Sequence, residues 1–162
     1  MCDYSLMAVP NRLAVSGEEL VVHRFEAGSV VELASARDLR NRREYRRVQP
    51  HGLWPRLKEF FNPPDAPAIP AVCIPPGARL LVQDIPPMLQ HECGFKEEAE
   101  EAVFTQITAA VNTFRDAIRF QNGVAVLLQR LAEGQRVRVL DLSSAEDQEI
   151  ALQGQRANVA LP

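Results

Sequence analysis

The sequence predicts a mainly β protein, a small barrel or sandwich of about seven to nine strands, with a helical, arginine-rich excursion attached to it. Three observations support this prediction. Short runs of β-branched and apolar residues recur along the chain, with Gly, Pro and Asn between them. An Asn-Gly pair at 122–123 joins two such runs as a tight hairpin. A chain of 162 residues that is 46% hydrophobic is also large enough to bury one full core.

The first forty residues predict short strands over 11–15, 19–25 and 29–33. The second of these runs is rich in Val and is followed by a turn signal at Gly28, so the second and third strands are expected to form a hairpin. Further strands are predicted over 71–74, 78–85, 116–120, 124–128 and 135–142, while 100–107 mixes helical and strand periodicities.

Residues 36–70 differ in character from the strands on either side. β-branched residues nearly vanish, and Arg, Leu and aromatic residues recur near helical spacing. This pattern predicts a helix that ends before Val48 and a short helical turn near 55–61. The proline-rich run 62–70 is predicted to be an extended linker. Eight of the eighteen basic residues lie in this excursion: Arg37, Arg40, Arg42, Arg43, Arg46, Arg47, Arg56 and Lys58.

Two passages of the chain, 74–85 and 131–142, resemble each other at an offset of 57 residues. In each, an apolar residue and a glycine-containing turn lead into a strand with one apolar face. The turn glycines, Gly77 and Gly134, can adopt the positive φ that such a turn requires. Many small β-barrels use such a unit more than once, so a structural pseudo-repeat and a chance similarity of a common string are both open.

Length and composition predict a single β-rich domain over 1–142 and a polar C-terminal tail over 143–162. No apolar run is long enough for a signal peptide or a membrane span, so we expect a cytoplasmic protein without membrane association. The net charge of -3 disfavours a protein devoted to nucleic acid but leaves local binding open. A homo-oligomer or a protein partner is equally compatible with the composition.

The sharpest functional hypothesis is a cysteine-based site that binds a transition metal or senses redox state. Cys2, Cys73 and Cys93 supply thiols and His91 an imidazole, which are donors that suit zinc, iron or copper. On an extended chain, residues two apart project to the same side, so His91 and Cys93 can both coordinate one ion. His23, on a predicted strand, is a further candidate ligand.

The same residues also have plainer interpretations. None of the standard Cys-x-x-Cys spacings is present, and Cys73 lies in an apolar string typical of a core strand. His91 and Cys93 precede an acidic run that is typical of a solvated loop. Three cysteines, an odd number without a secretory signal, argue for reduced thiols rather than a disulfide framework.

A second hypothesis is covalent catalysis by Cys2, should Met1 be trimmed to leave a thiol and an α-amine on one residue. Asp3 would orient the base, which is either that amine or His23. The opening superficially resembles amidohydrolases with an N-terminal cysteine nucleophile, but the chain lacks the length and the helices for their four-layer sandwich. No complete triad is evident, so the sequence leaves open whether the protein is an enzyme.

The alternative comes from another class of protein: a noncatalytic interaction module that docks a protein or nucleic acid through the basic excursion 36–61. Its arginines can line phosphates, and Tyr45, His51 and Trp54 can stack on bases. The competing structural interpretation is a solvated helix face that pairs with the acidic run 97–101. The leucines and aromatic residues of the excursion also fit packing on the sheet or on a second subunit.

Four strings of the chain are informative together: Met1-Cys2-Asp3-Tyr4-Ser5-Leu6, Val72-Cys73-Ile74-Pro75-Pro76-Gly77, the run 114–123, and Leu128-x-x-Leu131-x-x-Gly134-Gln135. They resemble a family of small bacterial proteins of unknown function, whose members share the opening string, a Cys-containing turn and a Gly-Gln strand. The resemblance implies no activity and singles out Cys2 and Cys73. Some members have a histidine pair where this chain has Phe114-Arg115, so no metal role carries over to that motif.

Overall fold

The computed structural model describes residues 9–25, 31–48, 68–107 and 114–143, and within them the chain is mainly β, as predicted. The strands are β1 (Asn11–Leu13), β2 (Glu19–Arg24), β3 (Val31–Ser35), β4 (Ala71–Cys73), β5 (Arg79–Val82), β6 (Glu100–Gln106), β7 (Asp116–Phe120), β8 (Ala125–Leu127) and β9 (Arg136–Asp141). The described helices are α1 (Ala36–Val48), α3 (Pro87–Cys93) and the 3-10 turn η2 (Leu128–Arg130). The short helix predicted near 55–61, most of the predicted linker and nearly all of the predicted tail lie outside these residues.

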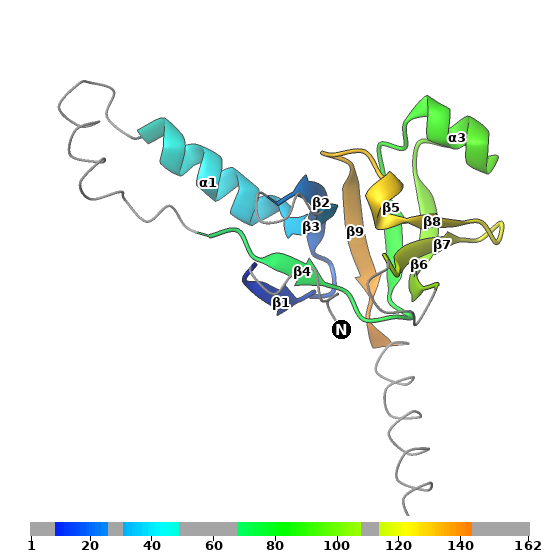
Figure 1. Cartoon of the computed structure of the whole chain (residues 1–162), viewed down its shortest axis with the longest axis horizontal. Helices are drawn as coiled ribbons and strands as arrows, with labels where there is room; N and C mark the ends of the chain where they lie inside the picture. The colour runs from blue at the N-terminus through cyan, green and yellow to red at the C-terminus, as the bar shows by residue number, and fades with distance from the viewer. Residues whose placement is uncertain (1–8, 26–30, 49–67, 108–113, 144–162) are drawn as a thin grey trace, which may run out of the picture.

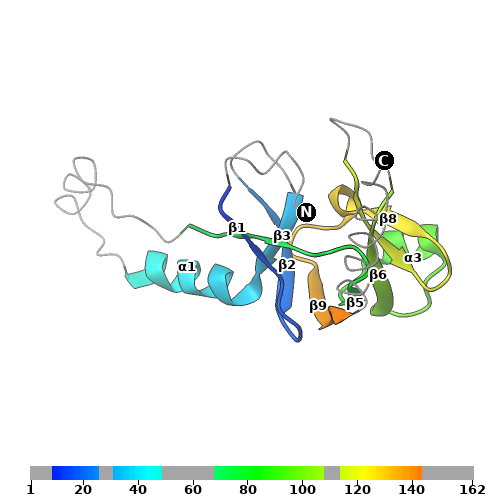
Figure 2. The ribbon, with the colours of Figure 1, turned by 90° about the horizontal axis from the view of Figure 1, so that it is seen from below.

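The nine strands form one mixed sheet in the order β1-β4-β3-β2-β9-β5-β6-β7-β8, in which only the β1–β4 pair is parallel. Figures 1 and 2 show β1 to β4 with α1 on one side of β9, and β5 to β8 with α3 on the other. Within the described residues, the end strands β1 and β8 do not pair, so the sheet is open rather than a closed barrel. Each is only three residues long and therefore offers few backbone groups for closure.

The two hairpins expected from the sequence are present. β2 and β3 pair antiparallel, and β7 and β8 pair antiparallel around the Asn122-Gly123 turn. Gly123 has a φ of 86°, which is the left-handed conformation that glycine adopts at little steric cost. The ambiguous run 100–107 is strand β6, because its backbone is paired with β5 on one side and with β7 on the other.

The larger of two hydrophobic core clusters lies on the inner face of the sheet, which curls so that η2, beyond the edge strand β8, contacts β3. The central strands have alternating burial, as expected of a sheet with one face in a core and one in water. Their fully buried side chains come from both halves of the sheet: Leu20, Val22, Leu80, Val82, Val137 and Val139. The two halves of the sheet therefore share this core cluster.

The predicted pseudo-repeat is visible in the pairing of β5 with β9. The two strands are antiparallel neighbours, and Leu81 lies opposite Arg138, its own counterpart at the offset of 57. The turns before the strands are also equivalent. Gly77 and Gly134 have φ values of 95° and 89°. Each turn donates its glycine N–H to a neighbouring strand, to the carbonyl of Phe104 and of Val22 respectively, at 2.8 Å in both cases.

Strand order extends this symmetry beyond the two matching passages. After β1, the sheet reads β4-β3-β2-β9 from one end and β8-β7-β6-β5 from the other. Two four-strand units, β2 to β5 and β6 to β9, therefore have the same topology. Each unit contributes its last strand to the other, so that β9 pairs with β2 and β5 pairs with β6. α1 occupies the β3–β4 connection of the first unit, where the second unit has a tight turn.

One sequence expectation about local structure is wrong. The segment holding His91 and Cys93 is the helix α3 rather than an extended chain. Pro87 stands in the first turn, where the missing N–H costs no hydrogen bond, and Gly94 ends the helix with a φ of 72°. Leu89 anchors the helix in the core. Seven residues are too few for the strong apolar periodicity that would have predicted this helix.

Candidate functional site

The proposed cysteine and histidine ligands do not gather at one place among the described residues. Cys2 lies outside the described residues. Cys73 is on β4, buried in the sheet, and is disulfide-bonded, which contradicts the expectation that it would be reduced. His23 is on β2, and its ring lies edge-on to that of Phe25 at 4.9 Å between centroids.

His91 and Cys93 are both on α3, but they project to different sides of it. Residues two apart on a helix point about 200° apart, and correspondingly His91 is exposed while Cys93 packs against the hydrophobic core. Burial raises the pKa of the free Cys93 thiol, because it disfavours the charged thiolate. This environment favours a protonated, unreactive thiol over a metal ligand.

Within the described ranges, no three His, Cys, Asp or Glu side chains are close enough to hold a metal ion. The interpretation of Cys73 as a core residue is confirmed by its exposed fraction of 8%. The five-residue metal set stays a prediction, since one of its members lies outside the described residues.

The second predicted site, the basic excursion, has a well-defined described part in α1. This helix carries six arginines, no lysine and two carboxylates, a net charge of +4 in a chain whose total is -3. Both views show α1 projecting away from the sheet (Figures 1 and 2), so most of its surface is not covered by strands. Its main contacts with the strands are those with β2 and β3.

The arginines of α1 divide between two sides of the helix. Arg42 is half-buried, on the side where Leu39 packs on a small apolar cluster beneath the helix. The exposed arginines recur at helical spacing on the opposite side, and we call them the arginine face: Arg37, Arg40, Arg43 and Arg47. The predicted packing role is therefore confirmed for Leu39, while the other leucines and aromatic residues proposed for it, at 53–61, lie outside the described residues.

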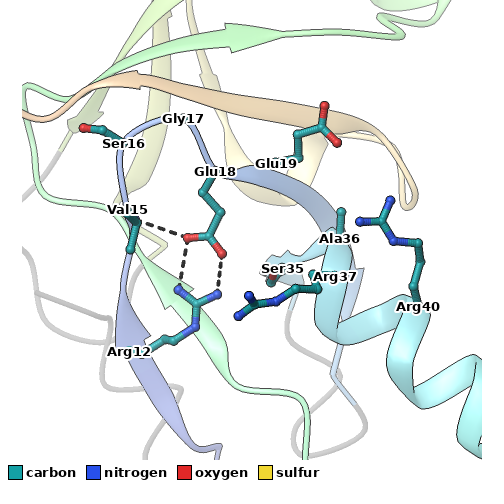
Figure 3. Close-up of a pocket in the computed structure, with 10 residues that line it drawn as sticks. All are labelled: Arg12, Val15, Ser16, Gly17, Glu18, Glu19, Ser35, Ala36, Arg37 and Arg40. Carbon is teal, nitrogen blue, oxygen red and sulfur yellow. Dashed lines mark hydrogen bonds and ion pairs between the residues drawn. The ribbon is translucent and has the colours of Figure 1, made fainter.

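A pocket of about 600 Å³ lies where α1 begins, between the helix and the turn that joins β1 to β2. Figure 3 shows Arg12 and Glu18 facing each other across this pocket, with Arg37 and Arg40 extending into it from α1. The guanidinium of Arg12 binds both carboxylate oxygens of Glu18, with one Nη1–Oε2 distance of 3.0 Å. The backbone N–H of Val15 donates to the same carboxylate at 3.2 Å.

The carboxylate of Glu18 is the negatively charged partner of Arg12 near the start of α1. Its burial by itself would raise the pKa, but hydrogen bonds from Arg12, from the Val15 N–H and from the Ser35 hydroxyl, with the charge of Arg12, outweigh this effect and lower the pKa. Arg12 also lies 3.7 Å from Asp38 in the first turn of α1. These contacts tie the start of α1 to the sheet.

The arginine face itself has little internal compensation. Arg37 lies 3.9 Å from Asp38, and Arg40 is close enough to Glu19 to lower the pKa of that carboxyl slightly, a smaller effect than that of Arg138. Among the described residues, Arg43 and Arg47 form no ion pair. An exposed array of permanent positive charges of this kind is suited to binding anions.

Sequence reasoning did not find the Arg12–Glu18 pair. The two residues are six apart across a turn, and Gly17, with a φ of 80°, was the only local signal that the chain reverses there. Sequence reasoning also gave no basis for separating Arg42 from the exposed arginines, because that separation depends on which side of α1 meets the sheet.

No family model matches this chain, and no curated protein or solved structure matches it either. Fold and site together define a mainly β protein with one open, internally symmetric sheet and a projecting basic helix. None of the helices in the described part of the chain has the length and apolar character needed to cross a membrane.

Proposed function

We propose that this protein is a noncatalytic interaction module that docks an acidic partner through the arginine face of α1. The observation that supports the proposal most directly is the placement of four arginines on one exposed side of a helix that projects from the sheet. Arginine stays protonated at any physiological pH, so the positive charge of this surface is permanent.

The competing interpretation, in which the helix neutralises the acidic run 97–101, has no support in the described contacts. Glu101 pairs with Arg79 at 3.0 Å across β6 and β5. α1 contacts β2 and β3, on the other side of β9. The described contacts therefore do not pair the arginine face with the acidic run, and Arg43 and Arg47 have their charges available for another molecule.

We expect charge reversal on the arginine face to weaken binding to an immobilised polyanion. The variant Arg43→Glu with Arg47→Glu should elute from a heparin column at clearly lower salt than the unmodified protein, because retention there depends on local positive charge. Arg42 is left intact because it is half-buried, so its reversal would disturb packing.

The matched control is Arg119→Glu with Arg130→Glu, which changes the net charge by the same amount at exposed positions away from α1. Circular dichroism of both variants should match the unmodified protein. Equal elution shifts for the two variants would show that net charge alone sets retention, and the proposal would fail.

A second candidate function rests on a different observation, the disulfide at Cys73. The sequence has three cysteines, and Cys93 is free, so Cys2 is the one cysteine left to pair with Cys73 within a single chain. In the cytoplasm expected for this protein, disulfides are usually transient and redox-sensing. We propose that Cys2 and Cys73 form such a reversible pair, dithiol when reduced and disulfide when oxidised.

Intact-mass analysis after alkylation tests this pair. In glutathione buffers of increasingly oxidising poise, the protein should pass from three alkylated thiols to one, as two electrons and two protons leave the pair for oxidised glutathione. Cys93→Ser should keep the transition, and Cys2→Ser should abolish it. Alkylation of Cys2 and Cys73 under every poise would exclude the redox role.

A further inference from the structure

We infer that the acidic partner of the arginine face is the phosphate backbone of a nucleic-acid duplex, bound without regard to base sequence. This inference rests on the proposed docking function and names the partner class. Three features of α1 support it: the spacing of its arginines, the absence of apolar residues among its exposed described positions, and the half-buried position of Tyr45.

The spacing of the arginines suits a linear array of charges. From Arg37 to Arg47 the axis of α1 advances about 15 Å at 1.5 Å per residue. One strand of duplex DNA places a phosphate about every 3.4 Å along its axis, so about four phosphates fall within the same length. The number of guanidiniums on the arginine face therefore equals the number of phosphates that one strand has in that axial length, and a guanidinium can donate two parallel hydrogen bonds to one phosphate.

The exposed side of α1 has a composition that protein partners rarely use. Besides the arginine face, its exposed described residues are Asn41 and Glu44. Arginine also anchors protein–protein interfaces, but there it is accompanied by apolar or aromatic residues at the buried centre, and none of these six exposed residues is apolar or aromatic. Contacts to a phosphate backbone need no such anchor, because Arg and Asn side chains supply most of them.

The half-buried residues of the helix explain why no base readout is expected. Tyr45, which the sequence suggested as a base-stacking residue, is half-buried rather than fully exposed. With the arginines occupied by phosphates, the exposed described residues of α1 left to reach a base edge are Asn41 and Glu44. A chain of net charge -3 binds a polyanion only where charge is local, and α1 is such a place.

Removing the negative charge of Glu44 tests whether the exposed side of α1 binds a negatively charged partner. It lies among the arginines on the exposed side of the helix, and no ion pair holds it within the described residues. Its carboxylate repels a phosphate backbone, so Glu44→Gln should strengthen binding a few-fold, the scale of one exposed charge interaction. A role of Glu44 in holding the helix together would produce the opposite change.

The experiment measures fluorescence anisotropy of a labelled, mixed-sequence DNA duplex of about 20 base pairs against salt concentration. Four phosphate contacts predict a slope of log affinity against log salt of about -3.6, and so a loss of about a hundredfold between 50 and 200 mM salt. Arg43→Gln with Arg47→Gln should reduce the slope by about 1.8, and Arg119→Gln with Arg130→Gln should leave it unchanged.

Labelled poly-L-glutamate, measured in the same way, separates this inference from the proposed function. Tighter binding of the duplex than of the polypeptide, with the predicted slope and its reduction in the Arg43→Gln/Arg47→Gln variant, supports the inference. Equal or tighter binding of poly-L-glutamate that needs the same arginines would overturn the nucleic-acid inference and leave the docking function standing. An unchanged duplex slope in the Arg43→Gln/Arg47→Gln variant, or no binding of either probe, would overturn both the nucleic-acid inference and the docking function.

Discussion

Replacing Leu80 by alanine is expected to lower the free energy of unfolding by about 3 kcal/mol, as is typical of a leucine removed from a packed core. Leu80 is fully buried on β5. This strand pairs with β9, the last strand of the other four-strand unit. The Leu80 side chain belongs to the cluster that combines residues from both halves of the sheet. A cavity at this position therefore weakens both four-strand units at once.

Urea denaturation monitored by circular dichroism measures the change, and Leu13→Ala is the matched control. Leu13 is on the edge strand β1 with 69% of its surface exposed, so the same chemical deletion there should cost less than about 0.5 kcal/mol. Unfolding should stay a single transition in both variants, because the larger core cluster combines residues from both halves of the sheet. Two separate transitions, or equal losses for the two variants, would contradict the shared core.

Glu18→Gln is expected to lower the free energy of unfolding by about 2 kcal/mol at neutral pH, the scale of hydrogen bonds to a charged group. The substitution keeps the shape of the side chain but removes the charge that Arg12 binds at both oxygens. The exposed fractions of the two side chains are 14% and 31%, so solvent screens this pair less than the other ion pairs of the protein. Loss of the pair should also loosen the start of α1.

The effect of this substitution should depend on pH in a defined direction. The folded protein holds the pKa of Glu18 below its ordinary value of 4.5, so folding favours the ionised carboxylate. The stabilisation is therefore fully present above pH 4.5 and is lost as the pH falls through the folded pKa. The difference between the unmodified protein and Glu18→Gln should accordingly be constant at neutral pH and shrink under acid.

Glu19→Gln is the control for this experiment, because Glu19 is adjacent in sequence and its pKa is also lowered, mainly by a hydrogen bond from Arg138. That pair is exposed on the surface of the sheet, so its loss should change stability far less. A difference between the unmodified protein and Glu18→Gln that does not change from neutral to acidic pH would show that the carboxylate is not the stabilising group.

Local signals were sufficient to predict most of the strands. The Asn122-Gly123 turn and the alternation of apolar residues on 135–142 each depend on neighbours in sequence, and both predictions are confirmed. The 57-residue offset also proved structural, because its two glycine turns make the same backbone contacts. Helix α3 was missed because it is short and its boundaries depend on Pro87 and Gly94 rather than on periodicity.

The candidate site was predicted in part. The concentration of arginines in 36–48 is a property of composition and was visible at once. The separation of Arg42 from the arginine face was not, because both kinds of arginine have the same local sequence character. The convergence of Cys73, His91 and Cys93 was proposed from residue type alone, and the described residues place them on β4 and α3.

The sequence by itself determined where strands and turns fall and that one helix carries concentrated positive charge, because hydrophobic period, turn chemistry and charge act over a few residues. Only the tertiary structure decided that β9 lies between β2 and β5, that the sheet stays open, and that Glu18 ties α1 to the sheet. These features depend on contacts between residues far apart in the chain or across a turn, whose free energy is set by packing and burial. The exposed arginines become a docking surface only because the fold turns them away from its core.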